Sequence, residues 1–90
     1  MQLELFWELA YNNQENQNAI REAGAIPQLV TLLGLDDDRT KQFVAGALAD
    51  LANKNPDNQN AIIDNINLIE GLKERIQEKH PGLYNALFTE

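Results

Sequence analysis

The sequence contains no cysteine, which excludes a disulfide framework and any metal site built on thiolates. Basic residues are scarce, since 7 Lys and Arg stand against 14 Asp and Glu for a formal charge of −7. Such a chain lacks the cationic clusters that bind nucleic-acid phosphates or anionic membrane surfaces. The excess of acidic residues favours basic partners only weakly, because the need for solubility also explains an acidic surface.

Long apolar runs are also missing, and none approaches the roughly 18 residues that span a bilayer. The N-terminus has no basic segment followed by an apolar one, as a secretory signal would have. We therefore expect a protein inside the cell, in the cytoplasm with the nucleus as the alternative. We expect it to bind neither nucleic acid nor membrane.

Residues for catalysis are few. His80 is the only histidine, and the sequence has no glycine-rich phosphate loop or nucleophile elbow. Asp36, Asp38 and Thr40 have the spacing of calcium-loop ligands, but Lys41 stands where such a loop requires glycine. The sequence predicts no enzyme, no cofactor and no metal site.

What the sequence does contain is an internal repeat. The string Asn-Gln-Asn-Ala-Ile occupies residues 16–20 and returns at residues 58–62, an offset of 42 residues. The match extends upstream, where residues 9–10 and 51–52 are both Leu-Ala. A period of about 40 residues is typical of helical solenoids, in which each unit buries its apolar face against the next.

The spacing of apolar residues predicts helices throughout and no strand. Asn13 and Asn55 have the residue type of helix N-caps, and Gly24 that of a C-terminal cap. A turn at residues 65–67 should precede a helix that carries Ile69, Leu72 and Ile76 on one face. The predicted helices span residues 2–12, 13–23, 27–33, 37–53, 55–64, 69–79 and 83–88.

These residues resemble the armadillo repeat. The family pattern is carried by NQENQNAI at residues 13–20, AGAIPQLVTLL at residues 23–33 and AGALADLA at residues 45–52. The resemblance spans most of residues 5–63 and fades beyond residue 65. It implies one all-α domain over residues 1–90, a right-handed α-solenoid. Its expected parts are an orphan third helix (1–12), a full repeat (13–54) and a degenerate C-terminal repeat (55–90).

The resemblance also implies a non-catalytic protein-interaction module, in which the long third helices line a groove for an extended peptide. Glu8 and Asp50 take the slots where the family commonly has a peptide-binding asparagine. Carboxylates flanked by an aromatic ring suit a segment rich in Lys or Arg, through charge-assisted hydrogen bonds and cation–π contact. The expected groove residues are Glu4, Glu8, Tyr11, Gly46, Asp50 and Asn53.

The first predicted helix favours an alternative function. Its apolar residues lie on more than one face, and a solenoid of about two repeats has too few helices to bury all of them. The chain would then be a structural piece that caps a longer solenoid or self-assembles, with a homodimer as the favoured form. The expected self-association residues are Leu3, Phe6, Trp7 and Ala10.

Overall fold

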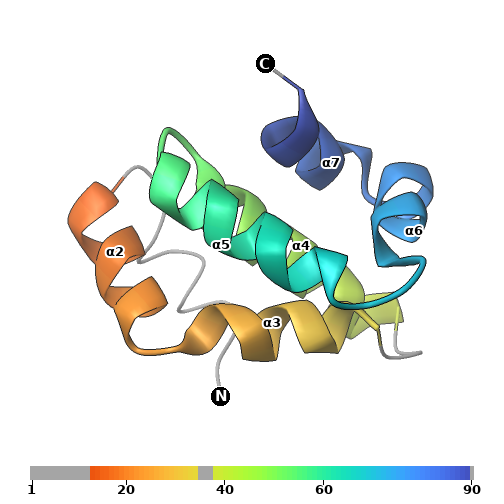
Figure 1. Ribbon diagram of the computed structural model, residues 1–90, viewed down its shortest axis with the longest axis horizontal. Helices are drawn as coiled ribbons and strands as arrows, with labels where there is room; N and C mark the ends of the chain where they lie inside the picture. Colours follow the sequence, from red (N-terminus) through yellow and green to blue (C-terminus); the bar gives the residue numbers. More distant parts are fainter. Residues whose placement is uncertain (1–12, 35–37, 90) are drawn as a thin grey trace.

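The computed structural model describes residues 13–34 and 38–89 (Figure 1). Within these ranges the chain forms helices and no strand. The helix expected at residues 2–12 lies outside the described residues. The helices are α2 (Gln14–Glu22), α3 (Ala25–Leu33), α4 (Asp38–Ala52), α5 (Pro56–Asn67), α6 (Leu72–Lys79) and α7 (Pro81–Phe88).

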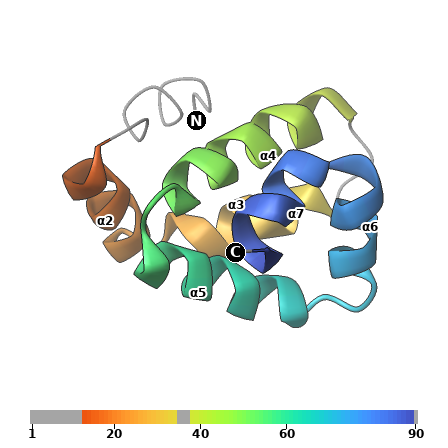
Figure 2. The same cartoon turned by 90° about the horizontal axis from the view of Figure 1, so that it is seen from above.

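Three helices form the centre of the molecule. Helix α3 packs against α4 and α5, and α4 also contacts α5 and α7. Helix α2 lies at one end, and α6 lies at the other (Figures 1 and 2). Helix α4 is therefore covered by helices from both halves of the chain, which makes it the common support of the described structure.

The predicted N-caps are confirmed. Asn13 accepts a hydrogen bond from the Asn16 amide at 2.9 Å, and Asn55 accepts one from the Asn58 amide at 3.1 Å. Neither cap residue has helical backbone angles: φ is −128° and ψ 95° at Asn13, and φ is −135° and ψ 87° at Asn55. A side-chain oxygen here satisfies one of the amides that an α-helix leaves unpaired at its start.

One apolar core runs through the described helices. The apolar stripe of α4 is buried, and Val44 and Leu48 have no exposed surface. Such side chains stabilise the fold by roughly 1.5–3 kcal/mol each. The core consists of Ile20, Ile26, Leu29, Val30, Leu33, Val44, Ala45, Leu48, Leu51, Ala52, Ile62, Ile66, Leu72, Ile76, Leu83 and Leu87.

The turn expected at residues 65–67 is wrong, because α5 continues through these residues to Asn67. Ile66 follows Ile62 by one turn and is completely buried, so ending the helix earlier would expose it. The side chain of Asn65 donates to the Ala61 carbonyl at 2.8 Å instead of supporting a turn. Apolar burial thus extends the helix past a sequence rich in turn residues.

Helix α6 also begins later than expected. Gly71 has a φ of +79°, the left-handed conformation, and α6 starts at the next residue. Leu72 and Ile76 are buried on α6 as predicted, whereas Ile69 lies in the turn before it. Helix α7 begins at Pro81, which suits a first turn because its missing N–H is not needed there.

Candidate binding face on helix α4

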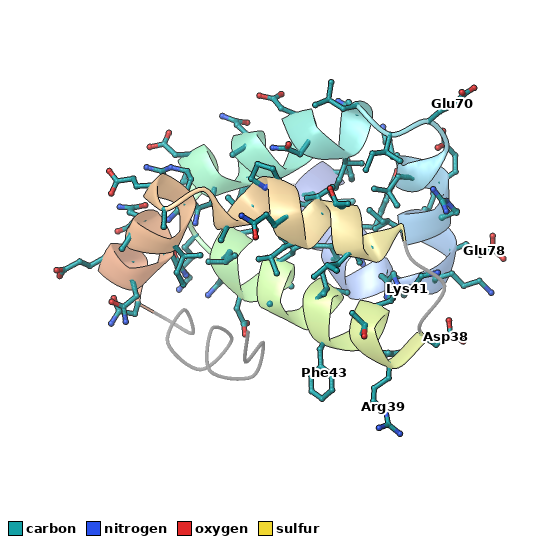
Figure 3. All side chains as sticks on the ribbon, turned by 90° about the horizontal axis from the view of Figure 1, so that it is seen from below. Asp38, Arg39, Lys41, Phe43, Glu70 and Glu78 are labelled. Carbon is teal, nitrogen blue, oxygen red and sulfur yellow. The ribbon has the colours of Figure 1, made fainter. Side chains whose placement is uncertain are left out.

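Helix α4 has one side in the core and another side turned away from it. The residues on the second side recur every three or four positions, which places them along one line of the helix. Figure 3 shows Arg39 and Phe43 pointing from this side away from the body of the molecule. We name this side the α4 outer face; it consists of Arg39, Phe43, Gly46, Asp50 and Asn53.

Three of the predicted groove residues lie on this face. Gly46 and Asp50 are half-buried, and Asn53 is exposed directly after the helix ends. The other predicted groove residues, Glu4, Glu8 and Tyr11, lie outside the described residues. So do the predicted self-association residues, which are Leu3, Phe6, Trp7 and Ala10.

Sequence reasoning missed two members of the face, Arg39 and Phe43. A signal for them was present, because Phe43 precedes Asp50 by seven residues and Arg39 precedes Phe43 by four. These spacings return to the same side of an α-helix. The face therefore carries a half-buried aromatic ring and a carboxylate about two turns apart.

Asp50 supplies the carboxylate of the face. Its Oδ2 atom is buried and accepts no hydrogen bond from the described residues. Burial raises the pKa of the Asp50 carboxyl above its ordinary value, because removing water disfavours the charged form. A hydrogen-bond donor or a cation placed against this atom would replace the water that burial removes and would stabilise the charged carboxylate.

Gln17, from α2, fixes the end of α4 on which Asp50 lies. Its Nε2 donates to the Asp50 carbonyl at 2.9 Å and to the Asn53 carbonyl at 3.4 Å. Gln17 is only 1% exposed, so these bonds form away from solvent. They satisfy carbonyl groups that an α-helix leaves unpaired at its C-terminal end.

Asn58, from α5, holds the same helix end from another direction. Its Nδ2 donates to the Leu51 carbonyl at 2.8 Å and to the Gln17 carbonyl at 3.1 Å. Its Oδ1 accepts from Arg21 Nη1 at 2.7 Å. The side chain is completely buried, and both of its polar atoms are paired.

Asn55 completes this network by donating from Nδ2 to Gln17 Oε1 at 3.0 Å and to Asn18 Oδ1 at 2.9 Å. We name the set the polar junction; its members are Gln17, Asn18, Arg21, Asn55 and Asn58. The two copies of the repeated string both contribute to it, residues 17–18 from the first and residue 58 from the second. Because its amides bond one another and the backbone, the junction positions α4 rather than presenting donors to a ligand.

No group of three or more His, Cys, Asp or Glu residues in residues 13–34 and 38–89 could hold a metal ion. No helix in that part of the chain has the length and apolar character to cross a membrane.

Helices that pack in succession along the chain, joined by a polar junction between copies of one string, define a helical-repeat protein. Comparison with known families agrees with this class. Residues 13–53 match the family described as Armadillo/beta-catenin-like repeat, and this segment is an armadillo repeat. No curated protein and no solved structure matches the chain. The family indicates a protein-interaction or scaffold module.

Proposed function

We propose that the chain is a non-catalytic interaction module that holds an extended basic peptide against the α4 outer face. The observation that carries the proposal is Asp50, whose Oδ2 is buried without a hydrogen-bond donor among the described residues. This atom lies on the long helix of the armadillo repeat, on the side that the core does not use. A Lys or Arg side chain of a peptide would give it a charge-assisted hydrogen bond.

Phe43 supports the same ligand chemistry. The ring is half-buried, points away from the body of the molecule, and is not part of the apolar core (Figure 3). An aromatic face attracts a cation, by about 0.5–1 kcal/mol at an exposed site. A peptide with basic residues at spaced positions could therefore contact Phe43 and Asp50 together.

The groove that we propose continues onto residues of the first predicted helix. Its full set would be Glu4, Glu8 and Tyr11 with Gly46, Asp50 and Asn53. The chain's formal charge of −7 adds a general attraction for a basic segment at low salt. We also propose that residues 55–90, with α5, α6 and α7, form a second, degenerate repeat. This repeat packs against α4 through α5 and α7.

The test uses a fluorescent peptide that alternates lysine with glycine, and a second peptide with glutamate in place of lysine. We expect Asp50→Asn to weaken binding of the lysine peptide about tenfold, the usual worth of a hydrogen bond to a charged group. Asp64→Asn is the matched control, because Asp64 is an exposed carboxylate on α5. Equal affinity of Asp50→Asn and Asp64→Asn for the lysine peptide would reject the face.

A second candidate function is self-assembly through the first predicted helix. Its support is the sequence pattern of Leu3, Phe6, Trp7 and Ala10, which places apolar side chains on more than one face. Sedimentation of the wild type and of Trp7→Glu tests it, and the proposal requires a dimer that the substitution dissociates. A monomer in both samples at about 100 μM, well above the Kd of a stable homodimer, would reject it.

A further inference from the structure

A pocket of about 310 Å³ lies at the opposite end of the molecule from the polar junction. It is formed by the C-terminal end of α3, the N-terminal half of α4, and α6. Its volume lies near the lower limit of small-ligand sites, which occupy about 300–1,000 Å³. We name it the basic pocket; it is lined by Leu33, Asp38, Lys41, Gln42, Leu72, Arg75, Ile76, Lys79 and His80.

The lining has a charge opposite to that of the chain. Among the described residues, Lys41, Arg75 and Lys79 line the pocket with one carboxylate, Asp38, which gives these residues a formal charge of +2 when His80 is neutral. The whole chain has a formal charge of −7. Three of its 7 Lys and Arg residues have thus been gathered at one cavity. In Figure 3, Glu70 and Glu78 point outward at this end of the molecule.

Within the described residues, ion pairs involve little of this positive charge. The ion pair found among the described residues joins Lys79 to its neighbour Glu78 at 4.0 Å, and both of those side chains are more than 70% exposed. Lys41 and Arg75 form no ion pair within the described ranges. Lys41 is also half-buried, so solvent screens its charge less than that of an exposed lysine.

His80 lies in the same pocket as these cations. Partial burial lowers the pKa of the His80 imidazole, and the charge of Lys41 lowers it further, while Asp38 on α4 opposes the shift. On α6, Arg75 and Lys79 line the same pocket. Because Lys41 and His80 line one pocket, both can act on a single bound anion.

We propose that the basic pocket binds a phosphate group, either as free inorganic phosphate or as the monoester on a phosphorylated side chain of a partner protein. A phosphate monoester carries about −1.5 to −2 charges near neutral pH, which matches the +2 of the lining. Its oxygens accept several hydrogen bonds, and the planar Arg75 guanidinium can donate two in parallel. The buried Leu33, Leu72 and Ile76 form an apolar floor, which strengthens the attraction by lowering the local dielectric constant.

The only histidine in the chain gives a direct measurement, because the ring protons of His80 are unambiguous in an NMR spectrum. Inorganic phosphate is titrated against chloride at constant ionic strength, and the pKa of His80 is followed. We expect phosphate to raise this pKa in a saturable manner, since a bound dianion stabilises the imidazolium. A linear drift without saturation would overturn the proposal.

Two double variants that lose the same charge distinguish binding of phosphate in the pocket from a general electrostatic attraction to the protein. Lys41→Gln with Arg75→Gln should weaken phosphate binding at least ~10-fold, because it removes two charged donors. Lys54→Gln with Lys73→Gln removes the same charge away from the pocket and should retain binding. Equal weakening in both variants would contradict the site. Thermal melts check folding, and Lys41→Arg, which keeps the charge, provides a variant that should still bind.

Two further arms identify the source and the class of ligand. A phosphoserine peptide and its unphosphorylated form are compared with inorganic phosphate, and tighter binding of the phosphopeptide would assign the pocket to a partner protein. Acetate that binds as tightly as phosphate would reject the preference for a dianion. Asp50→Asn should leave phosphate binding unchanged, so failure of the α4 outer face and failure of the pocket are distinguishable.

Discussion

Asn13 and Asn55 begin equivalent helices in the two halves of the chain, yet only one of them is buried. Both have similar, non-helical backbone angles and cap the amide three residues ahead. Asn13 is exposed, whereas Asn55 is 2% exposed and also bonds Gln17 and Asn18. The cap is a local property that the repeat preserves. The burial is a property of position, because the second copy packs against the first.

The two halves differ more in their later helices. Helix α3 has 9 residues and α4 has 15, whereas α6 and α7 have 8 each. The family match ends at residue 53, close to the end of α4. The second half therefore retains the polar contacts that join it to the first and shortens the helices beyond them. This comparison predicts where substitutions are costly and where they are tolerated.

The largest effect is expected from Leu48→Ala, which tests whether the two halves unfold as one unit. Leu48 has no exposed surface and lies on α4, the helix contacted by α3, α5 and α7. Removing a buried leucine side chain costs about 2–5 kcal/mol. Urea unfolding measures the loss, and amide hydrogen exchange should show reduced protection in α3 and α5 alike.

Leu68→Ala is the control for this substitution, because Leu68 is 81% exposed. A surface change of this kind should alter the free energy of unfolding by less than about 0.5 kcal/mol. Lost protection in only one half of the Leu48→Ala protein would show that the halves unfold separately.

Alanine substitution of the two N-cap residues compares an exposed cap with a buried one. Asn13→Ala should cost about 1 kcal/mol, the usual value of an N-cap. Asn55→Ala should cost about 2–4 kcal/mol, because the cap is lost and buried partners in the polar junction are left unpaired. Equal losses in thermal or urea unfolding would mean that burial adds nothing to the second cap.

Much of the first half was predictable from sequence because its signals are local. Caps, the glycine at residue 24 and the apolar stripe of α4 each depend on neighbours within a turn or two. The end of α5 was not predictable in this way. Asn65 and Asn67 indicate a turn locally, while the burial of Ile66 depends on helices distant in the sequence. Tertiary packing decided between these preferences.

The candidate sites were less predictable than the fold. Asp50 was found by aligning the chain with the family slots, and the same method passed over Phe43, which matches no slot. The basic pocket could not be predicted, because Lys41 and Arg75 are far apart in sequence and line one pocket only in the folded chain. Charge composition gave the opposite indication, since it sums the whole chain and hides a local excess of cations.

Glycines in the left-handed conformation are expected to respond to substitution differently from a glycine inside a helix. Gly24 and Gly71 precede α3 and α6 with φ of +83° and +79°, and a Cβ at either would touch nothing within 4 Å. Alanine there should cost about 1–2 kcal/mol through backbone strain alone. Gly82, in α7, has ordinary φ and equally open space.

Gly82→Ala should therefore stabilise the protein by about 0.5–1 kcal/mol, because it removes conformational freedom from the unfolded chain. Glycine-to-alanine substitution should thus lower stability at Gly24 and Gly71 and raise it at Gly82. The melting temperatures of the three variants measure these effects. Destabilisation by Gly82→Ala as large as that by Gly71→Ala would show that strain is not the cause.

The smallest effect on stability is expected at Asp50, and its sign depends on pH. Burial raises the pKa of the Asp50 carboxyl above 3.8, its value in the unfolded chain. The folded state then holds the proton more tightly, so stability falls as pH rises from 3.8 through the folded pKa. Asp50→Asn removes this penalty and should be more stable than wild type near neutral pH.

The difference between the two proteins should shrink below pH 3.8, where the carboxyl is protonated in both states. Melts of wild type, Asp50→Asn and the exposed control Asp64→Asn at acidic and neutral pH measure it. A stabilised Asp50→Asn that binds the lysine peptide less tightly would indicate that the carboxylate is retained for binding at a cost in stability. A variant that is neither more stable nor weaker in binding would remove Asp50 from the α4 outer face as a functional residue.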